Sequence, residues 1–393
     1  MIPAIMPTYA RWDVVVDRGE GCYLYAADGR RFLDFTSGIA VTSLGHCHPQ
    51  LVAALTAQAQ KLWHVSNLFQ IPGQQRLAER LIANSFADTV FFNNSGAEAV
   101  ELAIKVARKY QSATGHPERY RVIACHGSFH GRSFATLAAA GAEAYLKGFG
   151  PVMEGFDHVA FNNLNEMRAA VTQETAAILV EPVQGEGGVR APGSGYLKGL
   201  REICDEFGLL LVFDEVQCGI GRTGRLFAHQ REGVAPDVMA VAKALGNGFP
   251  IGACLASEKA AVGMVAGSHG STFGGNPMAA AAGNAVLDLM LEPGFFPRVD
   301  KISGLLRTKL EGLVARHPRL FAELRGAGLL LGIRCQPEVT AGDFVAKLRA
   351  EGLLCLTAGE NVLRILPPLI VGEREIDEGM AILDKVARAW PQP

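Results

Sequence analysis

The sequence lacks the marks of several protein classes. It contains only 8 cysteines in 393 residues, and no two of them form a Cys-x-x-Cys pair, so neither zinc-ribbon nor redox-motif spacing is present. Its 37 Lys and Arg nearly balance 39 Asp and Glu, and the net charge of −2 offers no electrostatic footprint for nucleic acid or an anionic membrane. Small molecules and other protein subunits are therefore the expected partners.

Long apolar runs are also missing. The most apolar stretch, residues 278–291, is interrupted by Asn284 and Asp288 and falls short of the roughly 20 residues that span a bilayer. The first residues lack the basic flank and longer apolar stretch of a signal peptide and include Pro3 and Pro7. Scattered cysteines are typical of buried, reduced thiols. We therefore expect a cytoplasmic protein.

What the chain does contain is a large apolar fraction, 49%, arranged in its middle as alternating strand-like and helical segments. Strands are predicted at residues 90–92, 121–124, 176–180, 209–213 and 237–242, and helices at 97–110 and 196–207. Continuous apolar strands separated by helices indicate an α/β fold with a mostly parallel central sheet covered by helices.

The two ends of the chain have a different pattern. Residues 23–25 and 31–35 flank Asp28 and Gly29 as a small hairpin. A charged helix at 298–316, strands at 328–333 and 362–366, and a final helix from Glu373 follow residue 293. We expect a large domain over residues 47–292, a smaller α+β domain over 293–393, and an N-terminal segment, 1–46, that packs with the small domain.

Lys243 ends an apolar strand-like run and is followed by Gly246, Gly248 and Gly252. Most lysines are solvated surface charges, so this position alone does not identify a reactive amine. Asp214 ends another apolar run and supplies a second group at a nearby strand end. An aspartate and a lysine placed in this way are the pair that pyridoxal phosphate chemistry requires.

A phosphate site is predicted where residues 94–98 begin a helix directly after a strand. Backbone N–H groups at a helix N-terminus bind phosphate through unpaired donors and the helix dipole. The same residues also form a plain capping box, with Ser95 as the N-cap and Glu98 three residues later. The presence of Lys243 and Asp214 favours the phosphate interpretation.

Two more loops follow predicted strands. Phe129 would stack on a planar cofactor and Arg132 would bind a carboxylate, although core packing and a surface salt bridge are the alternatives. Glu186 is flanked by glycines at the carboxyl edge of the sheet, where open α/β sheets bind ligands. It is either a solvated loop residue or a mobile polar group in the site.

Two other motifs suggest different chemistry. Gly219 and Gly224 bound a G-x-G-x-x-G sequence, which would make the protein an NAD-dependent dehydrogenase. The fingerprint needs its first glycine at the strand end, and residues 214–218 intervene here. His46 and His48 form the H-x-H of some metal hydrolases, but the remaining histidines show no ligand spacing. We favour neither and expect no metal.

Together these segments resemble the class III, fold type I pyridoxal-phosphate aminotransferases over essentially the whole chain. The class resemblance lies in residues 129–132, 181–186, 214–217 and 271–277. Residues 34–41, 44–49 and 64–69 look most like acetylornithine aminotransferases. The resemblance implies the fold type I architecture and a homodimer whose site lies at the subunit interface.

The resemblance also implies roles for individual residues. Lys243 looks like the lysine that forms a Schiff base with the cofactor, and Asp214 like the partner of its pyridine nitrogen. Family members often have Thr where this chain has Ala97, so Ala97 is expected to contribute only a backbone contact. The implied catalytic residues are Lys243, Asp214 and Glu186; the cofactor-binding residues are Ser95, Gly96, Ala97, Phe129, Asp214, Val216, Gln217, Lys243 and, from the other subunit, Thr272; the substrate-binding residues are Arg132, Glu186, Ser271 and Arg364.

The implied reaction is transamination of N2-acetyl-L-ornithine with 2-oxoglutarate, giving N-acetyl-L-glutamate 5-semialdehyde and L-glutamate, a step of arginine biosynthesis. By resemblance, Arg364 binds the carboxylate beside the reacting carbon of glutamate, Arg132 binds the distant one, and Glu186 pairs with Arg364 when N-acetylornithine enters. Ile39 stands where ornithine aminotransferases carry a tyrosine, and residues 64–69 argue against 4-aminobutyrate. Other amines of this class, including N-succinylornithine and N-succinyl-diaminopimelate, remain alternatives.

Overall fold

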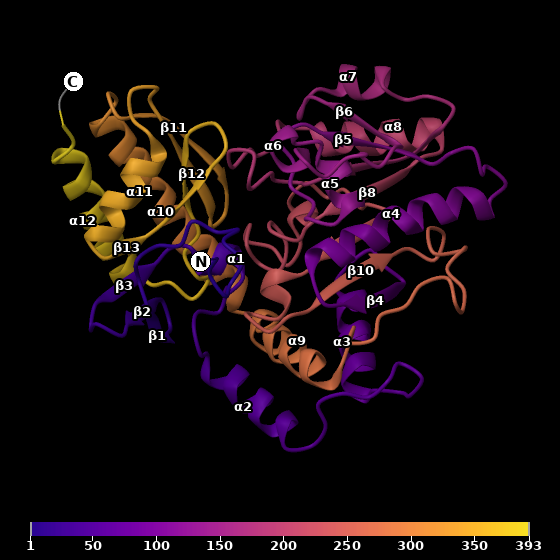
Figure 1. Ribbon diagram of the computed structural model, residues 1–393, viewed down its shortest axis with the longest axis horizontal. Coiled ribbons are helices and arrows are strands. Elements are labelled where there is room, and N and C mark those ends of the chain that lie inside the picture. The colour runs from indigo at the N-terminus through magenta and orange to yellow at the C-terminus, as the bar shows by residue number, and fades with distance from the viewer. Residues whose placement is uncertain (1, 392–393) are drawn as a thin grey trace.

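The computed structural model describes residues 2–391, which form three sheets with helices packed around them (Figure 1). The largest sheet has seven strands in the order β4 (Thr89–Asn93), β10 (Gly252–Ala256), β9 (Val238–Val241), β8 (Leu210–Asp214), β7 (Thr175–Val180), β5 (Arg121–Cys125) and β6 (Phe156–Val159). Strands β9, β8, β7, β5 and β6 pair in parallel. Only β10 runs against its neighbours, so β4 points the same way as β9. The predicted α/β fold with a mostly parallel sheet is confirmed.

Helices cover both faces of this sheet, which explains why its central strands β7, β8 and β9 are apolar at nearly every position. On β7, Ala177 and Leu179 pack under α4 (Gly96–Ala113), while Ile178 and Val180 pack under α8 (Tyr196–Phe207). All six residues of β7 are buried. Burying one such aliphatic side chain contributes about 1.5–3 kcal/mol, so the sheet is a rigid platform for the loops at its edge.

The residues after α9 (Pro277–Met290) build a second sheet, with the antiparallel order β11 (Phe321–Ala327), β12 (Leu330–Cys335), β15 (Val362–Ile365) and β14 (Leu356–Ala358). Two helices pack against it, α10 (Phe295–Arg316) and α11 (Ala341–Ala350), and α12 (Glu373–Arg388) packs against both of these helices. Figure 1 shows this orange and yellow region on the opposite side of the molecule from α4 and α8.

The third sheet joins the two ends of the chain. Its order is β1 (Val16–Glu20), β2 (Tyr23–Ala26), β3 (Arg31–Asp34) and β13 (Leu353–Leu354). The first three strands are antiparallel, whereas β13 pairs with β3 in parallel, through Leu353 with Leu33. The N-terminal hairpin therefore lies against the C-terminal region, as the indigo and yellow ribbons of Figure 1 show.

The apolar stretch at residues 278–291 is almost entirely the helix α9, which packs against α2 (Pro49–Ala59) and α3 (Pro72–Ala83). Within residues 2–391, no helix is both long and apolar enough to cross a membrane. The shorter helices are α1 (Ser37–Ala40), α5 (Phe134–Ala140), α6 (Glu143–Leu146), α7 (Leu164–Ala169), η1 (Ala228–Arg231) and η2 (Lys243–Leu245).

The strand directions decide where the functional loops meet. Since β4, β5, β7, β8 and β9 all point the same way, the residues that follow them emerge at one edge of the sheet. These residues include Ser95, Phe129, Glu181, Asp214 and Lys243. Five segments that are far apart in the sequence are thus brought together by the sheet.

Candidate active site

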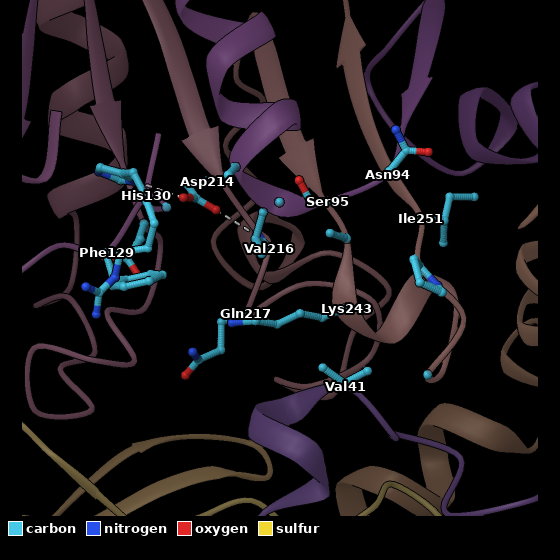
Figure 2. A pocket seen from close by; sticks show the side chains of 18 of the residues that line it. Val41, Asn94, Ser95, Phe129, His130, Asp214, Val216, Gln217, Lys243 and Ile251 are labelled. Carbon is cyan, nitrogen blue, oxygen red and sulfur yellow. Dashed lines mark hydrogen bonds and ion pairs between the residues drawn. The ribbon is translucent and has the colours of Figure 1, made fainter. Parts of the chain in front are cut away.

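A cavity of about 390 Å³ lies at this edge of the sheet (Figure 2). The residues that line it include most of the predicted cofactor site, Ser95, Gly96, Ala97, Phe129, Asp214, Val216, Gln217 and Lys243, together with the predicted substrate-binding residue Arg132. Figure 2 shows Phe129 and His130 on one side of Asp214, and the Lys243 side chain reaching across toward Gln217. Of the predicted cofactor-binding residues, only Thr272 lies outside it.

Asp214 is the last residue of β8, and its carboxylate is held at both oxygens. Its Oδ2 lies 2.8 Å from His130 Nδ1, and its Oδ1 accepts the backbone N–H of Val216 at 2.9 Å. A carboxylate only accepts, so Nδ1 of His130 carries a hydrogen. The opposite ring nitrogen, Nε2 of His130, is buried and has no partner among the described residues. The pair therefore presents an oriented negative charge at the cavity wall.

Lys243 is two residues beyond the end of β9 and begins η2 with a φ of +45°, in the left-handed region. Such backbone costs a non-glycine residue about 1–3 kcal/mol and is concentrated at functional sites. The side chain is part-buried because it borders the cavity. Burial lowers its pKa below the ordinary lysine value, against the opposing effect of Glu186. Its environment thus favours the neutral, nucleophilic amine.

The N-terminus of α4 forms another wall. Ser95 accepts the N–H of Glu98 at 3.2 Å, as expected for the N-cap of the predicted capping box. Glu98, however, accepts the N–H of Asn94 at 2.6 Å and not that of Ser95, so this cap is not a reciprocal capping box. It does not use the N–H groups of Gly96 and Ala97, which also have no carbonyl partner within the helix. Gly96 is required here, since a Cβ would lie 2.6 Å from Val216 Cγ1. The cap and an anion site therefore coexist.

Two titratable residues of this cavity were not predicted as site residues. Glu181 follows β7 and accepts the backbone N–H of Phe129 at 3.1 Å. Burial, reinforced by the nearby charge of Asp214, raises the pKa of Glu181 well above its ordinary value. His130 is the other. Both belong to motifs that the sequence shows. Glu181 directly follows a predicted strand, and that position is the signal that could have identified Glu181 as a site residue.

A second cavity, of about 840 Å³, shares Val41, Phe129, Arg132 and Lys243 with the first. Its other walls come from distant parts of the chain: Thr8, Tyr9, Gly38, Ile39, Ser133, Phe134, Leu137, Tyr145, Phe149 and Glu186. The guanidinium of Arg132 lies 3.8 Å from the centre of the Tyr145 ring and forms no ion pair with any described residue. It is therefore free to bind a carboxylate in this cavity.

Arg364 on β15 lines neither cavity and is only 2% exposed. Its Nη1 donates to Glu186 Oε1 at 2.5 Å and to Gln217 Oε1 at 3.2 Å. Burial would raise the pKa of Glu186, but the guanidinium of Arg364 outweighs this, so the pKa lies below its ordinary value. Glu186 lines the larger cavity and Gln217 the smaller, so the ion pair stands between them.

Apart from Arg364, the predicted residues that line neither cavity are Ser271 and Thr272. Ser271 is part-buried and accepts the Nδ2–H of Asn94, a residue of the smaller cavity, at 3.3 Å. Thr272 is exposed to solvent. Both therefore lie beside the site on the surface of this chain.

The two competing motifs have other structures. Gly219 and Gly224 lie in a run of turns, and no helix N-terminus follows them at which a dinucleotide would bind. Nε2 of His46 lies 2.8 Å from Asp34 Oδ2, and His48 precedes the first residue of α2. No group of three or more metal-ligating side chains occurs within residues 2–391.

The smaller cavity fits pyridoxal phosphate. Free N–H groups at the start of α4 suit the phosphate, the Asp214 carboxylate suits a protonated ring nitrogen, and Phe129 and Val216 offer apolar surfaces for a flat ring. Lys243, which lines the same cavity, supplies an amine. The donor set is thus complete for that cofactor, except for what a second subunit would add.

Known proteins are similar to this chain over nearly its whole length. The family described as Aminotransferase class-III matches residues 5–387. The chain is 58% identical over 387 residues to acetylornithine aminotransferase 1 of Bradyrhizobium diazoefficiens, which covers 98% of this chain and 95% of the relative. It is 55% identical over 387 residues to the acetylornithine aminotransferase of Rhodobacter capsulatus, covering 98% of each chain.

Solved structures give the same result. The ornithine aminotransferase of Toxoplasma gondii matches with a TM-score of 0.94 at 31% identity, covering 98% of this chain and 93% of that one. A second structure of that protein, with TM-score 0.94, 31% identity and coverage of 98% and 92%, is described with PLP at its active site. The N-acetylornithine aminotransferase of Stenotrophomonas maltophilia matches with a TM-score of 0.85 at 40% identity, covering 97% of each chain.

Proposed function

This chain belongs to the class III aminotransferases, and we propose that it transfers the terminal amino group of N2-acetyl-L-ornithine to 2-oxoglutarate. The products are N-acetyl-L-glutamate 5-semialdehyde and L-glutamate, which places the enzyme in arginine biosynthesis. It is a pyridoxal-phosphate-dependent enzyme. The observation that carries the proposal is the buried pair of Arg364 and Glu186 beside Lys243, because a reaction with two unlike substrates needs a carboxylate site that can be neutralised.

The cofactor would be held by the walls of the smaller cavity. The backbone N–H groups of Gly96 and Ala97 would bind its phosphate, Phe129 and Val216 would enclose its ring, and Gln217 would lie near its phenolic oxygen. When bound, pyridoxal phosphate supplies a conjugated ring that accepts the electron pair left on the substrate carbon after proton removal.

Asp214 and Lys243 would do the proton chemistry. The carboxylate of Asp214, oriented by His130 and Val216, would keep a positive charge on the ring nitrogen. Lys243 would be the covalent attachment point and, once released by the incoming amine, would take the proton from the substrate carbon at Nζ and return it to the cofactor side. The lowered pKa of Lys243 suits a base that must be neutral to act.

The two arginines would distinguish the substrates. Glutamate would place one carboxylate on Arg364 and the distant one on Arg132. N-acetylornithine has no carboxylate beside its reacting carbon, and Glu186 would then stay on Arg364. Leaving a buried charge without its partner costs about 3–5 kcal/mol, so this pairing keeps the idle arginine compatible with the second substrate.

A homodimer would complete the site. The segments at residues 62–69 and 265–274 lie side by side, since Asn67 Nδ2 donates to the carbonyls of Ser271 and Gly274. They expose large apolar side chains: Trp63, Leu68, Phe69, Val265 and Phe273. Apolar surface of this kind is typical of a protein interface. Covering it with a second copy would bring the partner's copy of the loop around Thr272 toward the cofactor site of this chain.

The domain division and location are further parts of the proposal. Pairing of β3 with β13 supports an N-terminal segment, residues 1–46, that packs with a small domain over 293–393, leaving 47–292 as the large domain. All eight cysteines are free thiols and seven are buried, which suits the reducing cytoplasm.

The test is a panel of single-turnover half-reactions followed by the visible spectrum of the bound cofactor. N-acetylornithine, N-succinylornithine, ornithine and 4-aminobutyrate are compared as amino donors. We expect N-acetylornithine to have the largest rate constant at low concentration. A larger value for free ornithine or 4-aminobutyrate would reject the substrate assignment, and a protein that takes up no pyridoxal phosphate would reject the function.

A further inference from the structure

The loop between Gly219 and Gly224 has no role in the proposed chemistry, yet it is packed as tightly as the site itself. Gly221, with a φ of +88°, leaves no room for a side chain, because a Cβ would lie 2.6 Å from Leu369 Cδ1. A Cβ on Gly224 would lie 2.6 Å from Asp300 Oδ1. The glycines of this motif therefore let segments of the C-terminal region approach the loop that follows Asp214.

Between these glycines, Arg222 is fully buried, with 0% of its surface exposed. Its Nη1 donates to the carbonyls of Pro367 at 2.5 Å and Leu329 at 3.3 Å, and its Nη2 donates to Ser43 Oγ at 2.9 Å. All three acceptors are neutral, and no described residue forms an ion pair with it. Burial lowers the pKa of Arg222 to about 9, which still leaves the guanidinium charged at neutral pH.

A buried charge without a counter-ion is destabilising, so its position calls for an explanation beyond packing. The three groups it binds belong to segments that are far apart in the sequence. Pro367 comes three residues after Arg364, Ser43 comes two residues after Val41 of the cavity wall, and the loop itself follows Gln217. Arg222 therefore joins the strand that carries Arg364 to the loop that carries Gln217.

Neighbouring hydrogen bonds show how closely these segments are tied. The N–H of Leu369 donates to the carbonyl of Ser43 at 2.6 Å, and the N–H of Leu329 donates to the carbonyl of Arg222 at 3.0 Å. Arg364 in turn reaches Gln217 at 3.2 Å. A shift of the residues after β15 would move Arg364 away from Gln217 and from the cavities.

We propose that Arg222 is a positioning residue, whose buried guanidinium holds the carbonyl of Pro367 and thereby fixes Arg364 against Gln217 for recognition of the substrate carboxylate. It does not touch substrate or cofactor. A lysine could keep the charge but not the planar fork of donors that spans Pro367, Leu329 and Ser43. The inference rests on the proposed role of Arg364 in binding glutamate.

The test compares Arg222→Lys with Arg225→Lys, a matched control in the same motif whose guanidinium is partly exposed and pairs with Asp300 at 2.6 Å. Both half-reactions, the cofactor spectrum and the melting temperature are measured. We expect Arg222→Lys to lower kcat/KM for glutamate by about 10- to 100-fold, as small misplacements of a binding group do, with much less effect on N-acetylornithine. Arg225→Lys should leave both unchanged.

A double variant decides whether the effect passes through Arg364. If it does, Arg222→Lys combined with Arg364→Lys loses little more glutamate activity than Arg364→Lys alone; losses that multiply would overturn the proposal. Equal losses for both substrates together with a lower melting temperature would also overturn the proposal, and so would the absence of any loss of activity. If Arg222→Lys does not fold, Ser43→Ala removes one acceptor and should give a smaller loss with the same substrate bias; an unbiased loss, or none, overturns the proposal.

The outcomes separate this inference from the proposed function. Wild-type protein that converts glutamate but not N-acetylornithine would reject the proposed substrate, while the glutamate arm would still report on Arg222.

Discussion

The cofactor side and the substrate side of the site are built in different ways. The cofactor side comes from the carboxyl edge of one sheet, where Ser95, Phe129, Asp214 and Lys243 follow four strands that point the same way. The substrate side is assembled from three separate regions, with Ile39 near the N-terminus, Glu186 in the middle and Arg364 near the C-terminus. The cofactor side thus depends on one rigid element, whereas the substrate side depends on how those regions pack.

This difference predicts that changes on the cofactor side affect both substrates equally, while changes on the substrate side discriminate between them. The first pair of changes below tests the cofactor side and the second pair the substrate side.

The largest effect is expected for Lys243→Ala. Loss of the amine that moves the proton should lower both half-reactions by at least about 10²- to 10⁴-fold. Single-turnover spectra measure this, and borohydride should no longer fix the cofactor to position 243. Lys301→Ala, at an exposed lysine paired with Glu373, is the control. Activity within tenfold of wild type would mean that another residue is the base.

The second largest effect is expected for Asp214→Asn, because this substitution keeps the shape of the side chain but removes the charge that faces the ring nitrogen. We expect a loss of about 10²- to 10³-fold, equal for the two substrates. The exposed Asp205→Asn serves as the control. A loss confined to one substrate would place Asp214 on the substrate side and remove the distinction drawn above.

Glu186→Gln should affect the two half-reactions unequally. Without its carboxylate, Arg364 keeps an uncompensated charge when N-acetylornithine enters, so that half-reaction should fall about tenfold more than the glutamate one, a difference of about 1.4 kcal/mol. Rate constants from both single-turnover reactions give the ratio. Glu206→Gln, at the surface, should leave it unchanged. Equal losses would reject the switching role of Glu186.

The smallest effect is expected for Glu360→Gln. Glu360 stands just before β15 and pairs with both Arg190 and Arg325, and the neighbouring Gly359 donates its N–H to the carbonyl of Glu186 at 2.8 Å. Partly exposed pairs contribute about 0–1 kcal/mol, so the substrate ratio should change less than about fivefold, in the direction of Glu186→Gln. High salt should reduce the difference from wild type. A change in the opposite direction would argue that the ion pairs of Glu360 do not hold the loop that carries Glu186 in place.

The sheet edge could be predicted because strand ends are visible in the sequence. Asp214 and Lys243 each close an apolar run, and the predicted strands overlap β4, β5, β7, β8 and β9. The left-handed backbone of Lys243 was not foreseen, because nothing in the run before it indicates a positive φ. Strand β10 was missed because its residues, Gly-Ala-Cys-Leu-Ala, are too few and too small to give a clear pattern.

Contacts between residues far apart in the sequence were harder to predict. The two residues of β13 carry no strand signal of their own and become a strand only through β3, more than 300 residues earlier in the chain. His130 stood in a recognised motif, but its bond to Asp214 follows from the adjacency of β5, β7 and β8. No local pattern in the G-x-G-x-x-G sequence indicates that Arg222 is buried against the carbonyls of Leu329 and Pro367 and the hydroxyl of Ser43.

The sequence by itself determined the chemistry at the end of each strand, because period and apolar content are local properties that the backbone must follow. Lys243, Asp214 and the helix start at Ser95 belong to this class. Only the tertiary structure decided which charges meet, as with Arg364 and Glu186, 178 residues apart, and which remain without a counter-ion, as with Arg222. Those outcomes depend on the order of strands and the packing of separate regions, since a charge is stabilised by whatever the fold brings within a few ångströms of it.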